Sequence, residues 1–333
     1  MFYEIFFFFL VPIFIFYLIY SNKHFISKKL NLYDIPDNKL KLHKKKTPKI
    51  GGVILIITSL ITFTACTIYK DFSLIYVLLL TYVCFLFGFI DDIYNINAKI
   101  KIITLTFIFL IFLLLFPDLL IKQIEFENLF FKKIFYLENR IYLSFFLTIL
   151  SYQLLVNAFN MSDGHDGISS LIAISVISYI LIFKLSKNYF FLMMPILTSL
   201  LLFLIYNIKS KIFLGDSGNY LLSIFFGSLI IDTNNIYKNF TAEEIFILLM
   251  LPGIDMLRLF YIRLKNKRNP FYGDRNHFHH LLIEKFEKKY VIIIYYLLFI
   301  TPIIFLNIKI INETYIILIF ILFYAALINK KNK

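Results

Sequence analysis

Residues 2–20 of this chain spell FYEIFFFFLVPIFIFYLIY, an apolar run in which Glu4 is the one charged side chain. A transmembrane helix needs about 20 predominantly apolar residues, and this run has that length. The beginning of the run carries an acidic residue, Glu4, instead of the basic residues of a signal peptide, and the run lacks a small-residue cleavage site. We therefore expect a membrane span that is retained, and not a cleaved signal peptide.

Runs of the same kind recur along all 333 residues, 60% of which are hydrophobic. A second example is ILIITSLITFTACTIY at 54–69. The chain is therefore predicted to be an all-α polytopic membrane protein, and a soluble domain with an ordinary core is excluded. No internal repeat or low-complexity linker divides it, so residues 1–333 are expected to form one integral-membrane domain.

Hydropathy predicts eleven transmembrane helices, and ten is the alternative because several runs are short. They lie near residues 2–20, 51–69, 74–90, 101–117, 141–156, 168–183, 189–206, 219–232, 244–260, 290–308 and 314–328. Cys66 and Cys84 fall inside such runs and are expected to be small buried apolar side chains.

Basic residues orient these helices. With the N-terminus outside, the inner segments carry 24 Lys and Arg and the outer loops carry 9. Because basic loops stay in the cytoplasm, we expect an outer N-terminus and a cytoplasmic C-terminus. The inner loops would be 21–50, 91–101, 157–168, 207–218 and 261–289. The net charge of +13 then lies mostly on the cytoplasmic face. The positive-inside rule explains part of this excess of basic residues, and we expect an anionic partner to explain the rest.

The residues able to do chemistry are concentrated on that same face. All six histidines and seven of the ten glycines fall in or beside the inner loops. The outer loops look connective, and residues 124–140 are expected to form a short extracytoplasmic β-hairpin. One face of the membrane is therefore predicted to carry the function.

The stretch NAFNMSDGHDGISS, 157–170, is polar between two apolar runs. Asp163 and Asp166 are three residues apart, a spacing that puts them on one side of a helical turn. One of them could be a helix N-cap, but that does not explain both acids or the amides of Asn157 and Asn160. Polar groups at membrane depth are costly and mark a site by default.

The stretch GFIDDIYNINAKIK, 88–101, ends a predicted span with Asp91 and Asp92. Two carboxylates at a helix C-terminus repel each other and oppose the helix dipole, so a structural role is hard to find. Mg²⁺ is the simplest neutraliser, because it prefers carboxylate oxygens and keeps positions open for phosphate. Lys99 and Lys101 are expected to face the same anion.

Two glycine-containing stretches lie at the same depth. KIFLGDSGNY, 211–220, places Asp216 at the entrance of a span, where a site is favoured over a simple turn. KLHKKKTPKIGG, 41–52, contains Lys46, a candidate substrate ligand, although positive-inside charge explains such lysines equally well. Its Gly51 and Gly52 allow close backbone approach to a ligand, or a tight helix start.

The stretch RNPFYGDRNHFHHLL, 268–282, combines Arg275 with His277, His279 and His280. Three histidines could bind zinc, but nearby arginines would repel a cation. An Arg and His cluster suits a diphosphate better, since arginine offers a fork of donors to phosphate oxygens. Together with the acids, these residues predict phosphoryl transfer at the depth of lipid headgroups.

Five stretches in this order resemble the polyprenyl-phosphate N-acetylhexosamine-1-phosphate transferases, glycosyltransferase family 4. They are HKKKTPKIGG, FIDD, VNAFNMSDGHDG, FLGDSGN and DRNHFHH, and the resemblance covers about residues 36–282. The family includes enzymes that begin O-antigen, common-antigen and teichoic-acid synthesis, and the phospho-N-acetylmuramoyl-pentapeptide transferase. The resemblance implies a multi-pass protein of the bacterial cytoplasmic membrane with its active site on the cytoplasmic side.

The resemblance also implies roles for individual residues. Asp216 looks like a metal ligand, and Asp91 and Asp92 look like the pair that serves the metal and the lipid phosphate. Asp163, a further candidate catalytic acid, resembles a residue on the nucleotide side, as do Asn160 and Asp166. The other candidate residues are expected to bind the substrates; they are Lys46, Lys99, Asn157, Asn160, Asp166, Arg275, His277, His279 and His280. Asp216 and Asp92 are the expected ligands of Mg²⁺, with Mn²⁺ as a substitute.

The order His-Phe-His-His at 277–280 is similar to the N-acetylglucosamine-1-phosphate branch. The implied reaction moves N-acetylglucosamine-1-phosphate from a UDP-sugar to undecaprenyl phosphate and releases UMP, the first membrane step of a cell-surface glycan such as lipopolysaccharide. UDP-MurNAc-pentapeptide and a modified UDP-N-acetylhexosamine are the alternative donors, and a covalent step through Asp91 stays open. Asn219 departs from the small Ser that is usual after this Asp-x-Gly, and the effect of His165 in the third stretch is open.

The partners implied are thus a UDP-sugar, undecaprenyl phosphate and membrane lipids, with no nucleic acid and with homodimerisation left open. A secondary transporter is the rival from another class, because intramembrane carboxylates also mark ion pathways. Carriers place such acids near the midplane between repeats. Here the acids lie at span ends on one side, which favours the enzyme.

Overall fold

The computed structural model describes residues 6–36, 45–127, 132–163, 167–184, 187–269 and 276–328. The first half contains η1 (Phe6–Leu10), α2 (Val11–Ser21), α3 (Lys23–Lys29), β1 (Tyr33–Asp34), β2 (Thr47–Pro48), α4 (Gly51–Tyr69), α5 (Phe72–Tyr94), α6 (Ala98–Leu115), η2 (Pro117–Leu119), β3 (Gln123–Phe126), β4 (Lys133–Tyr136) and α7 (Ile141–Ser162). The second half contains α8 (Ile168–Phe183), α9 (Lys187–Asn207), α10 (Gly215–Tyr237), α11 (Ala242–Lys265), α12 (Phe278–Lys285), α13 (Lys288–Ile308) and α14 (Glu313–Ile328).

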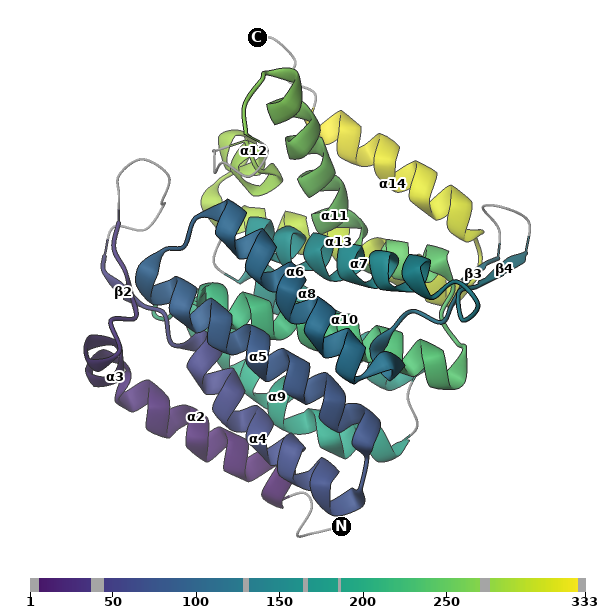
Figure 1. Cartoon of the computed structure of the whole chain (residues 1–333). Helices are drawn as coiled ribbons and strands as arrows, with labels where there is room; N and C mark the ends of the chain where they lie inside the picture. The colour runs from purple at the N-terminus through teal and green to yellow at the C-terminus, as the bar shows by residue number, and fades with distance from the viewer. Residues whose placement is uncertain are drawn as a thin grey trace.

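The all-α membrane architecture predicted from the sequence is confirmed, and every predicted apolar run coincides with a helix (Figure 1). Six of the described helices are long and apolar enough to cross a membrane, or up to seven if the pair α2 and α3, bent by 67°, counts as one span. Three further apolar helices, including α8 and α14, are shorter. The count of eleven crossings therefore stays a prediction.

Helix α10 is the centre of the bundle. It packs against α4, α5, α7 and α8, and every residue from Ser217 to Asn234 is buried. A helix that is buried on all sides has no lipid-facing stripe. By contrast, α6 exposes large apolar side chains such as Phe107 and Leu114, as expected for a surface that contacts lipid.

The two ends of the bundle differ. Strands β3 and β4 pair antiparallel with Gln123 opposite Tyr136, which confirms the β-hairpin predicted near 124–140. Figure 1 shows this hairpin on the right, while β2 and α3 lie on the left and α12 lies at the top. The end of α5 meets the start of α10, so the predicted inner loops 91–101 and 207–218 come together at one end of the bundle.

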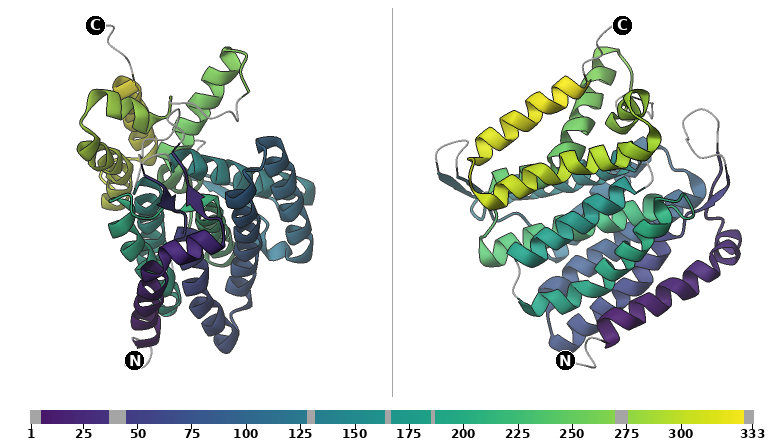
Figure 2. Two further views of the ribbon diagram at one scale, coloured as in Figure 1. Left: turned by 90° about the vertical axis from the view of Figure 1, so that its left-hand side faces the viewer. Right: turned by 180° about the vertical axis from the view of Figure 1, so that it is seen from behind.

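Helices α11 to α14 form the last layer. In Figure 2, seen from behind, α13 and α14 lie side by side, with α11 beside them at the top. Helix α11 contacts both α13 and α14, and the short α12 packs on α13. The histidine segment is thus carried by the C-terminal helices.

Glycines let three helices meet at the start of α10. A Cβ on Gly52 would lie 2.6 Å from the Gly218 nitrogen, and one on Gly88 would lie 2.7 Å from the Ser217 Cα. Backbone atoms cannot yield to such contacts, so only glycine allows this approach. The Gly51 and Gly52 N–H groups donate to the carbonyls of 213 and 214. Of the two roles expected for Gly51 and Gly52, the tight helix start is the one that these contacts provide.

Candidate functional site

Asp92, near the end of α5, caps the start of α10. Its Oδ1 accepts the Asp216 N–H at 3.0 Å, and its Oδ2 accepts the Ser217 N–H at 3.0 Å and the Ser217 hydroxyl at 2.7 Å. The first N–H groups of a helix lack partners within the helix, and the helix dipole favours a negative charge there. Sequence alone offers Asp92 no structural role, because it opposes the dipole of its own helix. The structure corrects this, since Asp92 stabilises the N-terminus of another helix.

Gly215 makes this cap possible. Its φ is +78°, and a Cβ at this position would lie 2.6 Å from the Asp92 Oδ2. Any other residue would strain the backbone and also push the carboxylate away. The glycine before Asp216 is therefore required by the contact with Asp92.

Asp91 is fully buried and holds a different set of contacts. Its Oδ1 accepts the Ile96 N–H at 2.9 Å, and its Oδ2 accepts the Tyr220 hydroxyl at 3.1 Å. The Lys101 ammonium lies 2.5 Å from the same Oδ2 and 3.4 Å from the Asp216 Oδ2. One lysine thus joins the carboxylates of α5 and α10.

Lys49 forms a second bridge between segments that are distant in the sequence. Its ammonium lies 3.5 Å from the Asp92 Oδ1 and 3.9 Å from the Asp34 Oδ1. The carbonyl of Pro48 accepts the Phe213 N–H at 2.8 Å. The β1–β2 hairpin is therefore attached to the acidic cluster and to the segment that precedes α10.

Two predicted lysines lie apart from these carboxylates. The Lys46 ammonium is 4.1 Å from the centre of the Tyr33 ring. Lys99 is exposed at the start of α6, whereas Lys101 reaches the cluster. Residues two apart on a helix point to different sides, and of the two lysines of this stretch only Lys101 forms ion pairs with the described carboxylates. The substrate contacts predicted for Lys46 and Lys99 stay predictions.

Asp163, at the end of α7, is also tied to α10. The Asn219 side-chain amide donates to the Asp163 Oδ2 at 2.8 Å. Asn219 is the departure from the family pattern noted in the sequence, and this bond gives it a local role. The first two turns of α10 thus contact Asp91, Asp92 and Asp163, so the acids of three motifs meet at one end of the bundle.

A polar cavity of about 230 Å³ opens beside this cluster. It brings together residues from several motifs, and its lining includes Lys101, Gln153, Asn157, Asn160, Tyr220, Phe260, Arg263 and His277. The side-chain amide oxygens of Asn160 and Gln153 are buried and have no hydrogen-bond partner among the described atoms. Such acceptors are costly unless a ligand or water satisfies them, which supports a binding role for the cavity.

The histidines predicted to contact the donor lie at the start of α12. The His277 ring lies 5.5 Å from that of His279, and the His279 ring 4.2 Å from that of His280. His277 lines the polar cavity, and His279 is buried. Asp166 and Arg275 lie outside the described residues.

Sequence reasoning missed Lys49, Tyr220 and Arg263. Tyr220 follows Asp216 by four residues, so helical spacing could have placed both on one face. Arg263 is an ionisable residue near the end of a predicted span, which is itself a signal. Nothing in the sequence around Lys49 indicates a role in the site, because cytoplasmic loops of membrane proteins are generally rich in lysine.

The cluster has the charge needed for a divalent cation. Among the described residues, the four carboxylates of Asp34, Asp91, Asp92 and Asp216 share the ammonium groups of Lys49 and Lys101. The Asp216 side chain is 32% exposed. No group of three or more His, Cys, Asp or Glu able to hold a metal occurs in the described parts of the chain. Mg²⁺ commonly uses one or two carboxylates together with phosphates and water, so these residues suit Mg²⁺ bound with a phosphate ligand.

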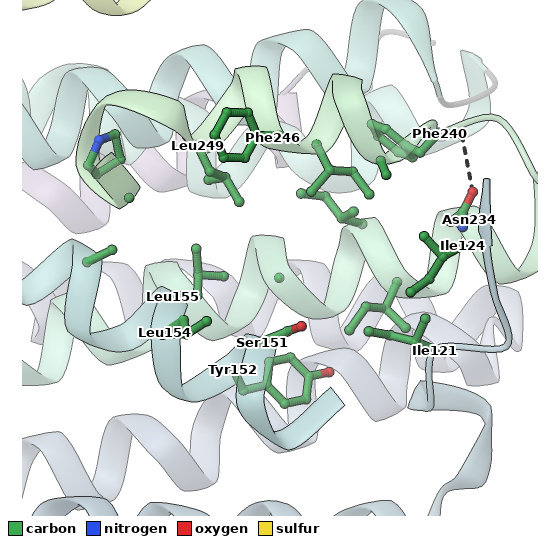
Figure 3. Close-up of a pocket in the computed structure, with 18 of the residues that line it drawn as sticks. Ile121, Ile124, Ser151, Tyr152, Leu154, Leu155, Asn234, Phe240, Phe246 and Leu249 are labelled. Carbon is green, nitrogen blue, oxygen red and sulfur yellow. Dashed lines mark hydrogen bonds between the residues drawn. The ribbon is translucent and has the colours of Figure 1, made fainter. Parts of the chain in front are cut away.

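A second, apolar cavity of about 430 Å³ lies between α7, α10, α11 and the β3–β4 hairpin. Figure 3 shows apolar side chains facing this space, with Phe246 and Leu249 on one side and Leu154 and Leu155 on the other. Both cavities use α7 and α11, and the polar cavity takes residues nearer the C-terminal ends of these helices. The two cavities therefore share helices α7 and α11, and the apolar cavity reaches toward β3 at the other end of the bundle.

Comparisons with known proteins identify relatives of this chain. Residues 74–234, from α5 to α10, match the family described as "Glycosyl transferase family 4". A Bacillus subtilis (strain 168) protein named "Probable undecaprenyl-phosphate N-acetylglucosaminyl 1-phosphate transferase" is 27% identical over 268 residues, 78% of this chain and 71% of its own length. Proteins named undecaprenyl-phosphate alpha-N-acetylglucosaminyl 1-phosphate transferase match from Escherichia coli O157:H7 (25% identical, 82% of this chain and 75% of the relative) and Thermotoga maritima (27%, 79% and 76%). These matches confirm the family resemblance predicted from the five motifs.

Proposed function

We propose that this chain, a relative of glycosyl transferase family 4, transfers N-acetylglucosamine-1-phosphate from UDP-N-acetylglucosamine to undecaprenyl phosphate. The products are undecaprenyl-diphospho-N-acetylglucosamine and UMP. The observation that carries the proposal is the convergence of Asp91, Asp92, Asp163 and Asp216 on the start of α10, beside a polar cavity. An apolar cavity lies along the second half of α10. The names of the relatives support the choice of donor and acceptor.

The apolar cavity suits the acceptor. Most of its lining is aliphatic or aromatic, and it lies between helices of a membrane bundle. A polyprenyl chain held between α7 and α11 would place its phosphate toward the polar cavity, at the end where the carboxylates lie. Burial of apolar surface would supply the binding energy, and the phosphate would be positioned by the neighbouring cations.

The polar cavity suits the donor. Lys101, Arg263 and His277 offer positive or adaptable donors to a diphosphate. Asn157 and Asn160 offer amides to the uracil or the sugar. These side chains would hold the donor with its β-phosphorus facing the lipid phosphate, so that positioning contributes most of the rate enhancement.

We assign Mg²⁺ to Asp216, whose carboxylate is one-third exposed, with Asp91 or Asp92 as its neighbour. When bound, the ion would neutralise the diphosphate and ease the departure of UMP. Asp92 already accepts three hydrogen bonds from α10, so we give it the task of fixing the Asp216 backbone. Its role as a second metal ligand, expected from the sequence, stays a prediction.

In the reaction, an oxygen of the lipid phosphate forms a bond to the β-phosphorus, and the bond from that phosphorus to the oxygen of UMP breaks. The electron pair leaves on UMP. A lipid phosphate is already anionic at neutral pH, so it needs no strong base. Asp91 is fully buried and already bonded to Ile96, Tyr220 and Lys101, which favours direct attack by the lipid over a covalent step through Asp91.

The test uses bacterial membranes that contain the protein, with Mg²⁺, labelled UDP-N-acetylglucosamine and undecaprenyl phosphate. We expect label in the lipid fraction, which disappears with Asp216→Asn and with a chelator and returns when Mg²⁺ is added. Asp118→Asn, an exposed acid paired with Lys122 at the hairpin end, is the matched control and should remain active.

Two outcomes would contradict the proposal. Uptake of a solute without lipid labelling would favour a transporter. Labelling from UDP-MurNAc-pentapeptide or a modified UDP-N-acetylhexosamine, but not from UDP-N-acetylglucosamine, would replace the donor and keep the chemistry.

A further inference from the structure

An ionised network inside α11 has no part in the reaction described above. Asp255 is buried, and its Oδ1 accepts from the Arg258 side chain at 2.7 Å and from the Tyr324 hydroxyl at 2.8 Å. Its Oδ2 accepts the backbone N–H of Phe278 at 3.0 Å. The single carboxylate therefore joins α11, the first residue of α12 and the C-terminal helix α14.

Arg258 extends this network to the residue just before the histidines. Its Nη2 donates to the carbonyl of Asn276 at 2.5 Å, and its Nε contacts the Tyr324 hydroxyl at 3.1 Å. The backbone on both sides of His277 is thus held by α11, through the carbonyl of 276 and the N–H of 278. Because His277 lines the polar cavity, the network fixes the backbone from which its ring enters that cavity.

Packing alone does not require these charges. The Phe278 ring already contacts the rings of Tyr324, with centroids 4.9 Å apart, and Tyr295, at 5.9 Å. Ionised groups within a membrane helix are costly and usually serve a function, and buried ion pairs add specificity of arrangement more than stability. Hydrogen bonds are directional, so they fix how α12 is rotated about its axis and where it lies along α11. Apolar contacts would not set these two parameters.

We propose that Asp255, Arg258 and Tyr324 are positioning residues that set the histidine segment 276–285 against the donor cavity. Helix α14, which lies beyond the stretch that resembles the family, is then part of the active-site framework. That this segment binds the donor rests on the proposed function. That the three residues fix the position of 276–285 does not.

The test compares two tyrosines of α14. Tyr324→Phe removes the hydroxyl that bonds Asp255 and keeps the ring contacts. Tyr315→Phe makes the same change at an exposed position of the same helix and is the control. We expect Tyr324→Phe to speed amide hydrogen exchange across 276–285 by about tenfold in nanodisc-embedded protein, and to raise the KM for UDP-N-acetylglucosamine by about tenfold. The KM for undecaprenyl phosphate should not change. Asp255→Asn should have the same pattern with a larger effect.

The readouts separate the two claims. If exchange across 276–285 is the same in Tyr324→Phe and Tyr315→Phe, the positioning network is wrong, whatever the enzyme does. If exchange rises while the donor KM is unchanged, the link to the donor is wrong. If the wild-type protein labels no lipid from any UDP-sugar, the proposed function fails, and the exchange result still decides the network. Should Asp255→Asn fail to fold, the Tyr324→Phe comparison remains decisive.

Discussion

Asp92 and Asp216 show how two carboxylates of one cluster take different tasks. Asp92 is buried and accepts three hydrogen bonds from the start of α10, whereas the Asp216 side chain is 32% exposed and contacts Lys101. A buried acceptor with several donors contributes to stability, because its loss leaves N–H groups unpaired. A partly exposed carboxylate such as Asp216 can still be reached by a ligand.

This difference predicts distinct effects of one substitution at the two sites. Asp92→Asn should lower the free energy of unfolding by about 1–3 kcal/mol and also reduce activity, since the start of α10 shifts. Asp216→Asn should abolish activity and leave stability nearly unchanged. Denaturation midpoints of the purified proteins, measured beside lipid-labelling rates, check both. Equal stability of the two variants would contradict the capping role of Asp92.

Asn219 is expected to position Asp163 through the 2.8 Å bond. Asn219→Ser shortens the side chain and should lower kcat/KM by about tenfold, the effect of losing a hydrogen bond to a charged group. A double-mutant cycle with Asp163→Asn isolates the pair, and we expect Asn219→Ser to have little further effect once Asp163 is replaced. Additive losses in the double variant would show that the two side chains act separately.

At the scale of elements, the N-terminus of α10 depends on how closely α4 and α5 approach it. The Gly88 Cα faces the backbone of Asp216 and Ser217, where a Cβ would lie within 2.8 Å of two atoms. The helix that carries the site therefore has a tightly specified position. Close packing of this kind tolerates little added volume.

Gly88→Ala should accordingly destabilise the protein by about 1–3 kcal/mol and reduce transfer, because the first turn of α10 must move. Gly253→Ala is the matched control, since a Cβ there meets nothing within 4 Å. Alanine also favours a helix over glycine by up to about 1 kcal/mol, so the control should be neutral or more stable. Thermal unfolding and lipid labelling of both variants measure this. A Gly88→Ala protein as stable as the control would contradict the close contact.

Gly253 also gives a way to fill the apolar cavity, which it lines. Gly253→Phe should occupy part of the space proposed for the polyprenyl chain and raise the KM for undecaprenyl phosphate, with the donor KM unchanged. Gly253→Ala, with one methyl group, should have a small effect or none. If the KM for the lipid is the same in both variants, the acceptor does not use this cavity.

At the scale of the whole molecule, the acidic cluster and the β3–β4 hairpin lie at opposite ends of α10. The distribution of basic residues predicts that the cluster end lies in the cytoplasm. Lys209 follows α9 near the cluster, and Lys309 lies between α13 and α14; both are exposed. The predicted orientation therefore assigns them to opposite sides of the membrane.

Cysteine labelling tests that orientation, with N-terminus outside and C-terminus inside. A membrane-impermeant maleimide added to intact cells should label Lys309→Cys and should label Lys209→Cys only after the membrane is opened. The native Cys66 and Cys84 are buried, so background should be low. Labelling of Lys209→Cys in intact cells would show that the orientation is opposite to the predicted one.

The sequence by itself determined which segments are helices and which motifs share one face. Apolar runs of membrane length form helices because backbone polar groups must be satisfied within the segment. The basic loops and the histidines indicate which ends of these helices carry the functional motifs. The five motifs also carried the family resemblance, and the hairpin near 124–140 followed from the polar interruption between apolar runs.

Only the tertiary structure decided what each polar side chain does. Asp92 meets Ser217 across 125 residues of chain, and Asn219 meets Asp163 across 56. Such partners depend on the rotation and crossing of packed helices, which local sequence does not specify. For the same reason the capping role of Asp92, the two bridging lysines and the Asp255 network emerged only when the helices were in place.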